Sequence, residues 1–389
     1  MFKIKTYNAI SDIIYNTLKN DEYQVSDSLE NYDGILVRSA ELADVEFPPE
    51  LVAIARAGAG TNNVPVTRCT EQGICVFNTP GANANAVKEL VLCAMLLSCR
   101  KVVNGIEWVK EAKASGETGI EKLAEKAKKN FVGPELYGKK LGVIGLGAIG
   151  GMVANSAARG FDMEVLGYDP YMNVESALHL TRVVRLTTDI NEIFSTCDYI
   201  TLHLPLLDTT KGMIGEAAFS KMKKGAVLIN YSRGGLVDTE ALKKAMISGI
   251  VRAYMTDFAV DELVDFPGVT ITPHLGASTP ESEENCADMA AKELNDYLKN
   301  GNIRHSVNLP DAMLPRAGVQ RLAIINRNTP NMVGQITSLL AADGINIENM
   351  LNKGRGSYAY TLLDLSDEVQ VSTVAAIRGI DGVLRVRVL

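Results

Sequence analysis

The chain has 389 residues, of which 47% are hydrophobic and 22% charged, so it has enough apolar side chains for two or three domains with buried cores. The formal net charge of −7 argues against nucleic acid or an anionic membrane surface as the main partner. A ligand that is itself anionic would therefore need a local group of basic residues.

No targeting segment opens the chain, because Met1 to Lys5 lead directly into an amphipathic pattern. No apolar run approaches the length of a membrane span. The six cysteines include no C-x-x-C pair, and we interpret them as reduced, mostly buried thiols rather than as a metal site or a nucleophile. These features predict a cytoplasmic protein with no bound metal and no membrane partner.

Residues 1–80 alternate short apolar runs with helical patterns, which is typical of a parallel α/β unit. Ligands of such sheets bind beyond the carboxyl ends of the strands, so the loops with Arg38-Ser39, Arg56 to Asn63 and Asn78 to Asn83 are candidate substrate contacts. For Arg38 and Arg56, a surface or salt-bridge role explains the position equally well. The expected strands cover 2–6, 34–38, 52–57 and 74–77, and the expected helices cover 10–18 and 65–72.

Residues 84–103 form a long apolar stretch with helical period, too interrupted by charge to cross a membrane. Helical propensity continues through 104–130 and ends in Lys126-Ala-Lys-Lys129. A charge run of this kind is usually a solvated face.

A glycine-rich turn joins an apolar strand pattern to a helical one near the middle of the chain. Gly145, Gly147 and Gly150 form G-x-G-x-x-G, and the next strand pattern, 164–168, ends at Asp169. Such glycines let the backbone approach a pyrophosphate at a helix N-terminus, and a carboxylate at this spacing accepts hydrogen bonds from an adenosine ribose. The pattern predicts a dinucleotide site, and the acid, which would repel a 2′-phosphate, favours NAD over NADP.

The alternation of strands and helices continues after this motif. An amphipathic helix over 281–299 follows, and the simplest arrangement returns it to the N-terminal unit. We therefore expect a discontinuous substrate-binding domain, 1–97 and 283–308, with an NAD-binding Rossmann domain, 98–282, inserted into it and a cleft between the two. Expected strands cover 183–186, 199–204, 226–230, 252–257 and 269–272, and expected helices cover 216–222 and 239–248.

The pattern changes after a Pro-bearing linker at 308–315. Residues 318–389 hold no His, no Cys and no obvious nucleophile, so we expect a regulatory or oligomeric role. The order of elements is βαββαβ, that of a ferredoxin-like fold, with strands at 321–326, 345–351, 358–365 and 382–389 and helices at 331–343 and 371–379.

Three polar residues follow late strands of the inserted domain and suit the oxidation of a secondary alcohol. His274 can take the hydroxyl proton near neutral pH, and a carboxylate such as Glu262 can fix the imidazole tautomer. The guanidinium of Arg233 can hold a 2-hydroxy carboxylate at two points. A lone His after a Pro is usually structural, but this combination within a dinucleotide-binding fold outweighs that reading.

With these motifs in place, the chain resembles the D-2-hydroxyacid dehydrogenases, and within them the branch that acts on 3-phosphoglycerate. The resemblance covers almost all of 35–290, and residues 318–389 resemble an ACT domain. The matching motifs are Arg56-Ala-Gly-Ala-Gly60, Asn78-Thr-Pro80, Gly145-Leu-Gly-Ala-Ile-Gly150, Arg233-Gly-Gly-Leu-Val-Asp238 and Pro273-His-Leu-Gly-Ala-Ser-Thr279.

The resemblance implies a role for each matching position. His274 is the acid/base, Glu262 its partner carboxylate and Arg233 the substrate-orienting arginine. Around Glu262 the sequence departs from the family pattern, and Asp261 stands beside it, so this assignment depends on spacing. Cofactor contacts are implied at Ala59, Gly145, Gly147, Ala148, Ile149, Gly150, Asp169, His203, Pro205, Tyr231, Ser232, Arg233, Asp257, His274, Gly276 and Ala277. Substrate contacts are implied at Arg38, Ser39, Arg56, Gly58 and Asn83, with Lys128 and Lys129 contributed by a neighbouring subunit of a homodimer or homotetramer.

The expected reaction is the NAD-dependent oxidation of 3-phosphoglycerate to 3-phosphohydroxypyruvate, the entry step of serine synthesis. Two alternatives stay open. One is a dehydrogenase for another D-2-hydroxy acid, such as glycerate, lactate or 2-hydroxyglutarate. The other is a non-catalytic NAD-sensing scaffold, and the intact Arg233, Glu262 and His274 argue against it.

The ACT resemblance also implies an effector site for L-serine. Asn331 and Asn346 match the polar positions that hold the amino acid in serine-inhibited relatives, since one amide can accept from an ammonium while another donates to a carboxylate. Thr329 stands where such relatives tend to carry a His, which removes one donor. The alternative is a domain that serves only as a dimer contact.

Overall fold

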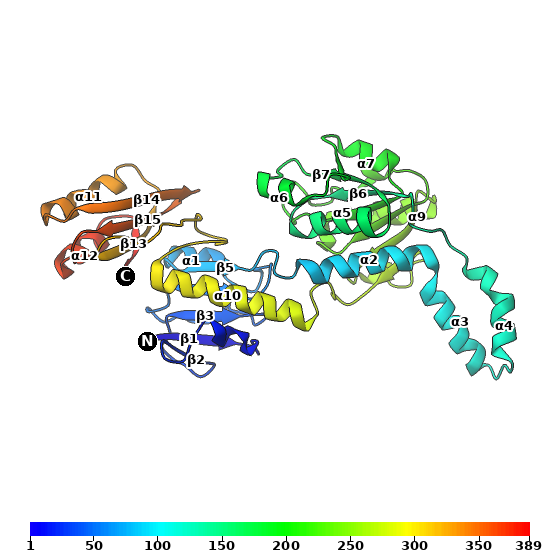
Figure 1. Ribbon diagram of the computed structural model, residues 1–389, viewed down its shortest axis with the longest axis horizontal. Coiled ribbons are helices and arrows are strands. Elements are labelled where there is room, and N and C mark those ends of the chain that lie inside the picture. Colours follow the sequence, from blue (N-terminus) through cyan, green and yellow to red (C-terminus); the bar gives the residue numbers. More distant parts are fainter. The chain divides into compact units, whose positions relative to one another are not determined.

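A computed structural model describes residues 1–389, apart from the side chain of Glu175. The chain folds into two compact units, with residues 84–279 inserted between the two segments of the first, 1–83 and 280–389 (Figure 1). By their contacts, residues 84–97 belong to the second unit. The predicted domain boundaries assign them to the substrate-binding domain. Among the described residues, none of the helices combines the length and the hydropathy needed to cross a membrane.

The first unit contains a parallel five-stranded sheet in the order β2-β1-β3-β4-β5. This is the flavodoxin-like order, in which the chain changes direction between β1 and β3. Arg38 comes directly after β3, so it lies at the ligand-binding edge of this sheet. The strands are β1 (Phe2–Tyr7), β2 (Tyr23–Ser26), β3 (Gly34–Val37), β4 (Ala53–Arg56) and β5 (Cys75–Asn78).

Helix α10 (Pro280–Asn300) returns from the second unit and packs on this sheet, mainly over β4. Its buried residues recur every three or four positions, and alanines let the helix approach the strands closely. The first turn carries Glu281 and Glu283, which are favourable at the positive end of a helix dipole. The other connections are the 3₁₀ turn η1 (Asp12–Asn16) and α1 (Val66–Glu71).

The second unit has a parallel seven-stranded sheet in the order β12-β11-β10-β9-β6-β7-β8. The order reverses at β6, as in dinucleotide-binding sheets, and the glycine-rich turn directly follows that strand. The strands are β6 (Lys140–Ile144), β7 (Glu164–Tyr168), β8 (Arg185–Leu186), β9 (Tyr199–Leu202), β10 (Ala226–Asn230), β11 (Val251–Thr256) and β12 (Val269–Ile271). The helices are α2 (Ala84–Arg100), α5 (Ala148–Gly160), α6 (Val174–His179), α7 (Ile190–Thr196), α8 (Glu216–Phe219) and α9 (Thr239–Ile247), with the 3₁₀ turns η3 (Gly234–Leu236) and η4 (Asp261–Leu263).

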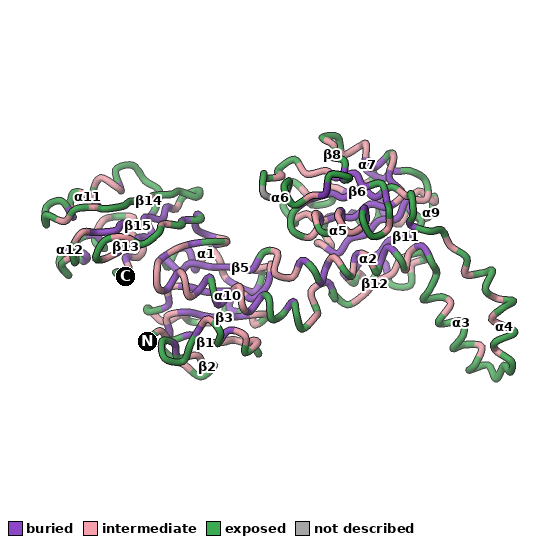
Figure 2. The backbone as a smooth tube through the Cα atoms, in the orientation of Figure 1, coloured by how far each residue is buried: buried purple, intermediate pink, exposed green. Residues whose placement is uncertain are grey.

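An arm of two helices leaves the second unit after α2. α3 (Val102–Ala114) and α4 (Ile120–Ala127), with η2 (Lys128–Phe131), contact each other and contain no buried residue (Figure 2). Several apolar side chains of α3 are exposed, namely Val102, Val103, Ile106 and Val109.

The C-terminal segment folds as predicted into a βαββαβ unit with an antiparallel sheet in the order β14-β15-β13-β16. Helices α11 and α12 contact each other, and the buried residues of both join one core with the sheet. The elements are β13 (Gln320–Arg327), α11 (Met332–Ala342), β14 (Ile347–Arg355), β15 (Tyr358–Leu365), α12 (Val371–Arg378) and β16 (Val383–Val388). The predicted fold class is confirmed: two parallel α/β sheets followed by a ferredoxin-like domain.

This C-terminal domain packs against the last turns of α10. Tyr360 and Leu362 share one hydrophobic cluster with Tyr297 and Leu298, and the Tyr360 hydroxyl donates to the Gly301 carbonyl at 2.6 Å. The contact is therefore part of the core of the first unit.

The structure corrects the helix predicted over 10–18. Only the 3₁₀ turn η1 forms there, because the two fully buried apolar side chains of the segment, Ile14 and Leu18, give it too small a buried face for a helix. Ser11 caps the turn by accepting a hydrogen bond from the N–H of Ile13. The edge strand β2, which precedes β3, was not predicted.

Candidate active site

The glycine-rich turn has the geometry that its sequence predicts. Gly145 has φ +92°, and a Cβ there would lie 2.4 Å from the carbonyl oxygen of His203. A Cβ on Gly150 would lie 1.9 Å from the carbonyl oxygen of Gly145, whereas Gly147 faces open space. Gly147 is the N-cap of helix α5 and offers no side-chain cap, so the first N–H groups of the helix remain available to an anion. The turn fits the pyrophosphate of a dinucleotide.

Asp169 lies beside this turn at the end of β7. Its Oδ2 accepts the N–H of Leu146 at 2.9 Å, and its Oδ1 accepts the N–H of Tyr171 at 2.9 Å. A carboxylate has about four acceptor positions, so capacity remains for ribose hydroxyls.

His203 packs against the glycine-rich turn. The ring is buried, and burial lowers the pKa of His203 to about 3, so the imidazole is neutral. Its Nε2 lies 3.0 Å from the hydroxyl of Thr201, and its Cδ2 would lie 3.3 Å from a Cβ on Gly150. His203 thus contributes packing against the glycine-rich turn.

Arg233 is held at the carboxyl end of β10 by a buried amide that the sequence analysis missed. Asn230 is fully buried, and its Nδ2 donates to the Arg233 carbonyl at 2.9 Å while its Oδ1 accepts the N–H of Ser232 at 3.2 Å. Ser232 in turn donates to the carbonyl of Leu204. The guanidinium of Arg233 is exposed and donates to the Ser232 carbonyl at 2.7 Å. The sequence did carry a signal for Asn230, because it is a polar residue at the end of an otherwise apolar strand.

Asp257 follows β11 and is buried, which raises the pKa of its carboxyl, although the Gly276 N–H that donates to Oδ2 at 3.0 Å acts in the opposite direction. Its Oδ1 has no hydrogen-bond partner among the described residues. A buried acceptor without a donor fits the amide N–H of a nicotinamide carboxamide. The residues present therefore fit NAD at both ends.

His274 follows β12 in a left-handed conformation, with φ +51°. Its N–H donates to the carbonyl of Asp257 at 2.9 Å and to that of Thr272 at 3.0 Å. The ring lies edge-on to Phe258, with centroids 5.2 Å apart, and the residue is exposed. A non-glycine residue held at positive φ is uncommon and is concentrated at functional sites.

Glu262 lies in η4 and is exposed. Among the described residues, no hydrogen bond or ion pair joins its carboxylate to the His274 ring. The pairing of Glu262 with His274 stays a prediction.

The predicted substrate loops of the first unit bring Arg38 and Arg56 together. Arg56 Nε donates to the Arg38 carbonyl at 3.0 Å, and its guanidinium lies against Gly58, where a Cβ would be 2.1 Å from Nη1. The Asn78 amide donates to the Ala59 carbonyl at 2.6 Å. Ser39 follows Arg38 in the same loop, and its N–H donates to the Asn8 side chain at 3.0 Å. Asn83 ends the first segment of this unit.

In the helical arm, Lys128 pairs with Glu125 at 2.5 Å, and Lys129 follows in η2.

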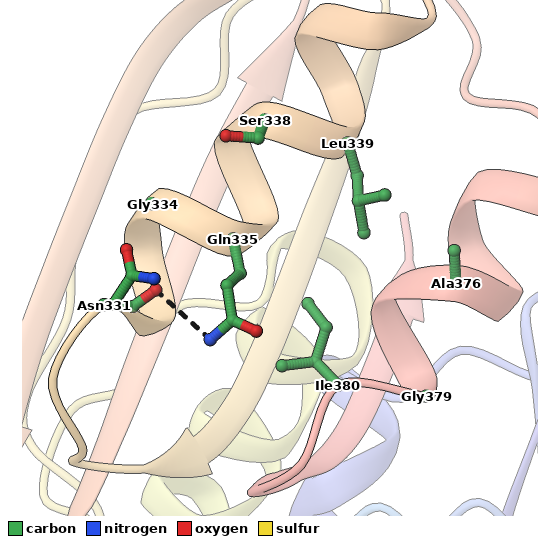
Figure 3. Close-up of a pocket in the computed structure, with 8 residues that line it drawn as sticks. All are labelled: Asn331, Gly334, Gln335, Ser338, Leu339, Ala376, Gly379 and Ile380. Atoms are coloured by element: carbon green, nitrogen blue, oxygen red, sulfur yellow. Dashed lines mark hydrogen bonds between the residues drawn. The ribbon is translucent and has the colours of Figure 1, made fainter.

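Asn331, a predicted effector residue, lines a groove of about 610 Å³ between α11 and α12, where its carbonyl accepts from the Gln335 amide (Figure 3). It also lines a smaller cavity of about 140 Å³ beside the β13–α11 turn. That cavity includes Asn326, a buried residue whose Oδ1 has no partner among the described residues and which the sequence analysis did not select. Asn346 donates to Glu348 at 3.1 Å.

Comparison with known proteins identifies the family. Residues 92–276 match the model of the D-isomer specific 2-hydroxyacid dehydrogenase, NAD binding domain. D-3-phosphoglycerate dehydrogenases from Haemophilus influenzae and Escherichia coli are 31% and 33% identical, over 97% and 95% of this chain and 91% and 90% of theirs. The Methanocaldococcus jannaschii enzyme of that name is 34% identical over 85% of this chain, which spans 62% of the longer relative.

Solved structures support the fold. The NAD⁺-bound 3-phosphoglycerate dehydrogenase of Entamoeba histolytica is 28% identical, with a TM-score of 0.62 over 79% of this chain and 98% of that one. D-mandelate dehydrogenase of Rhodotorula graminis, at 20% identity and a TM-score of 0.66 over 81% of this chain and 99% of that one, shares the fold. The chain belongs to the NAD-binding D-2-hydroxyacid dehydrogenases, in the group of the D-3-phosphoglycerate dehydrogenases.

Proposed function

We propose that this enzyme oxidises 3-phosphoglycerate to 3-phosphohydroxypyruvate with NAD, the first step of the phosphorylated route to L-serine. The observation that carries the proposal is the match with relatives of that name along nearly the whole chain, including the C-terminal domain. The pair of arginines at the edge of the first sheet, Arg38 and Arg56, supplies the local positive charge that a phosphorylated substrate needs in a protein of net charge −7.

In this proposal His274 takes the proton from the 2-hydroxyl group, and Arg233 holds the substrate carboxylate by two parallel N–H groups. NAD, when bound, supplies the hydride acceptor. Asp257 would hold its carboxamide, and Asp169 its adenosine ribose. Glu262 would stabilise the imidazolium that forms as the hydroxyl proton leaves.

The test is an NADH-linked assay of the reverse reaction across a panel of 2-oxo acids. We expect kcat/KM to be highest for 3-phosphohydroxypyruvate, well above hydroxypyruvate, pyruvate and 2-oxoglutarate. Equal rates for phosphorylated and unphosphorylated acids would favour the second candidate, a dehydrogenase for another D-2-hydroxy acid. Loss of turnover with all of them would favour a non-catalytic NAD-binding role.

We further propose a homodimer or homotetramer in which the arm formed by α3 and α4 contacts a second copy. Support comes from the exposed valines and isoleucine of α3, which have no partner among the described residues. In such an assembly Lys128 and Lys129 would add positive charge to the neighbouring subunit's substrate site. Sedimentation of the intact enzyme, with and without Ile106→Glu on the arm, checks the oligomeric state.

The C-terminal domain has the element order of an ACT domain, and we propose L-serine as its effector. The asparagines around the β13–α11 turn supply amide donors and acceptors of the kind that an amino acid needs. A domain that serves only to join subunits is the alternative.

A further inference from the structure

Arg38 is held in an unusual way at the edge of the first sheet. Its backbone carbonyl accepts hydrogen bonds from Arg56 Nε at 3.0 Å and from the Asn63 amide at 3.4 Å. The next two N–H groups, of Ser39 and Ala40, donate to the side chain of Asn8. Its guanidinium reaches across to α10, where Nη2 donates to Glu283 Oε1 at 2.5 Å. The main chain is thus fixed by several side chains, and Glu283 is the anion that pairs with the guanidinium.

Glu283 itself sits on a rigid support. It belongs to the first turn of α10, a helix of 21 residues whose inner face is part of the core. The far end of that helix is held by the C-terminal domain, where Arg387 donates to the carbonyls of Tyr297 and Leu298. The backbone of Glu283 is therefore as well fixed as that of Arg38. Both side chains are 42% exposed, so they can separate without disturbing the core.

We propose that Glu283 tunes the affinity of Arg38 for phosphate: its carboxylate occupies Arg38 in the free enzyme and is displaced by the phosphate of the substrate. This inference rests on the proposed function, because it takes that phosphate as the group that Arg38 binds. A carboxylate carries one negative charge, whereas a phosphate monoester carries nearly two and offers three acceptor oxygens. A phosphate can therefore replace Glu283 at Arg38, and a 2-oxo acid without phosphate has no group that reaches it.

The size of the effect follows from the exposure of the pair. Exposed ion pairs contribute little, and removal of one changes an equilibrium by about two- to five-fold. Glu283 should therefore weaken phosphate binding by that factor, while it lowers the binding of other anions at Arg38 as well. Its role is therefore to set the affinity of Arg38 for anions in general.

The first test uses Glu283→Gln with Glu284→Gln as the matched control, since Glu284 is an exposed neighbour on the same helix. We expect Glu283→Gln to lower KM for 3-phosphohydroxypyruvate about two- to five-fold, by more than any change in kcat, and to leave KM for hydroxypyruvate where it is. Glu284→Gln should change neither value. A raised KM in Glu283→Gln would show that Glu283 holds Arg38 in its binding orientation, and an unchanged KM would show no coupling; either result overturns the proposal.

A second measurement separates this inference from the proposed function. Inorganic phosphate is used as a competitive inhibitor of whichever 2-oxo acid the enzyme reduces best. We expect its inhibition constant to fall about two- to five-fold in Glu283→Gln but not in the double variant Arg38→Gln/Glu283→Gln. If unphosphorylated acids are the better substrates, the proposed function fails, and the phosphate constants still decide the pairing. Equal constants in wild type and Glu283→Gln overturn it, whatever the substrate.

Discussion

His274, the proposed base, shows how the backbone can position a side chain before any substrate binds. Its left-handed conformation is maintained by two N–H hydrogen bonds, to the carbonyls of Asp257 and Thr272. Phe258 contacts one edge of the ring. The carboxylate of the same Asp257 accepts from the Gly276 N–H, so Asp257 holds the turn after β12 at two points, through its carbonyl and through its side chain. Strain of this kind persists only where the surroundings impose it.

The first prediction at this scale concerns the base. His274→Ala should lower kcat about 10²- to 10⁴-fold, because a general base typically contributes that much, while NADH still binds. Stopped-flow or steady-state assays give kcat, and the fluorescence of bound NADH gives its affinity. A variant that keeps half of the wild-type turnover would assign the base to another residue.

The same assay identifies the partner carboxylate. Glu262 and Asp261 are adjacent and both exposed in η4, so Asp261→Asn is the matched control for Glu262→Gln. We expect only Glu262→Gln to lower kcat. The opposite pattern would move the role to Asp261.

At the scale of elements, α10 connects the C-terminal domain to the predicted substrate loops of the first unit. Arg321 of β13 is fully buried and donates to Asp364 at 2.6 and 2.9 Å, and to the carbonyl of Asn300 at the end of α10 at 2.8 Å. Further donors of the Arg321 guanidinium reach the carbonyls of Leu314 and Pro315 in the linker. A guanidinium with this many acceptors fixes several chain segments at once.

The second prediction follows from that pair. Asp364→Asn should lower the free energy of unfolding by about 3–5 kcal/mol, because it leaves the buried charge of Arg321 without its anion. Replacing both, as Arg321→Met/Asp364→Leu, should cost less, since no buried charge is then left unpaired. The remaining loss comes from the carbonyls of Asn300, Leu314 and Pro315, which lose their donor. Urea unfolding of the three proteins checks the order. Equal losses for the single and double variants would contradict it.

The third prediction concerns Glu293, on the buried face of the same helix. Burial, reinforced by Asp311, raises the pKa of Glu293 to about 9, and its Oε1 lies 2.8 Å from Nδ1 of His305, which precedes the linker. Because this pKa is above that of the unfolded chain, the folded state holds more protons between about pH 5 and 9, and stability falls as pH rises through that window. Glu293→Gln should reduce this loss. Melting temperatures at pH 6 and pH 9, with Glu284→Gln as the control, measure the difference.

At the scale of the whole molecule, the features that sequence predicts best are local ones. The G-x-G-x-x-G turn with Asp169, the strands of both sheets apart from β2, and the βαββαβ order depend on residues close in the chain. Periodicity and glycine spacing therefore reveal them. The 3₁₀ turn at 12–16 was missed because its tertiary context decides whether a helix forms.

Contacts between distant residues could not be predicted in that way. Arg38 and Glu283 are 245 positions apart, and Arg321 and Asp364 are 43 apart on two strands. Only the fold brings them together, and no pattern in either neighbourhood distinguishes them from ordinary surface charges. Asn230 is similar, since burial and not sequence shows that its amide holds the loop of Arg233.

The last prediction links the C-terminal domain to activity. α10 runs from Glu283, beside Arg38, to the turns that Tyr360 and Arg387 hold, so a ligand that alters the C-terminal domain has a rigid element through which to act on the substrate loop. We expect L-serine at millimolar concentration to inhibit the enzyme and to raise its melting temperature, because a ligand of the folded state stabilises it. Asn346→Ala should weaken both effects, whereas Asn349→Ala, an exposed amide on the following strand, should not. An enzyme whose activity and melting temperature ignore L-serine would leave the domain with a role in subunit contact only.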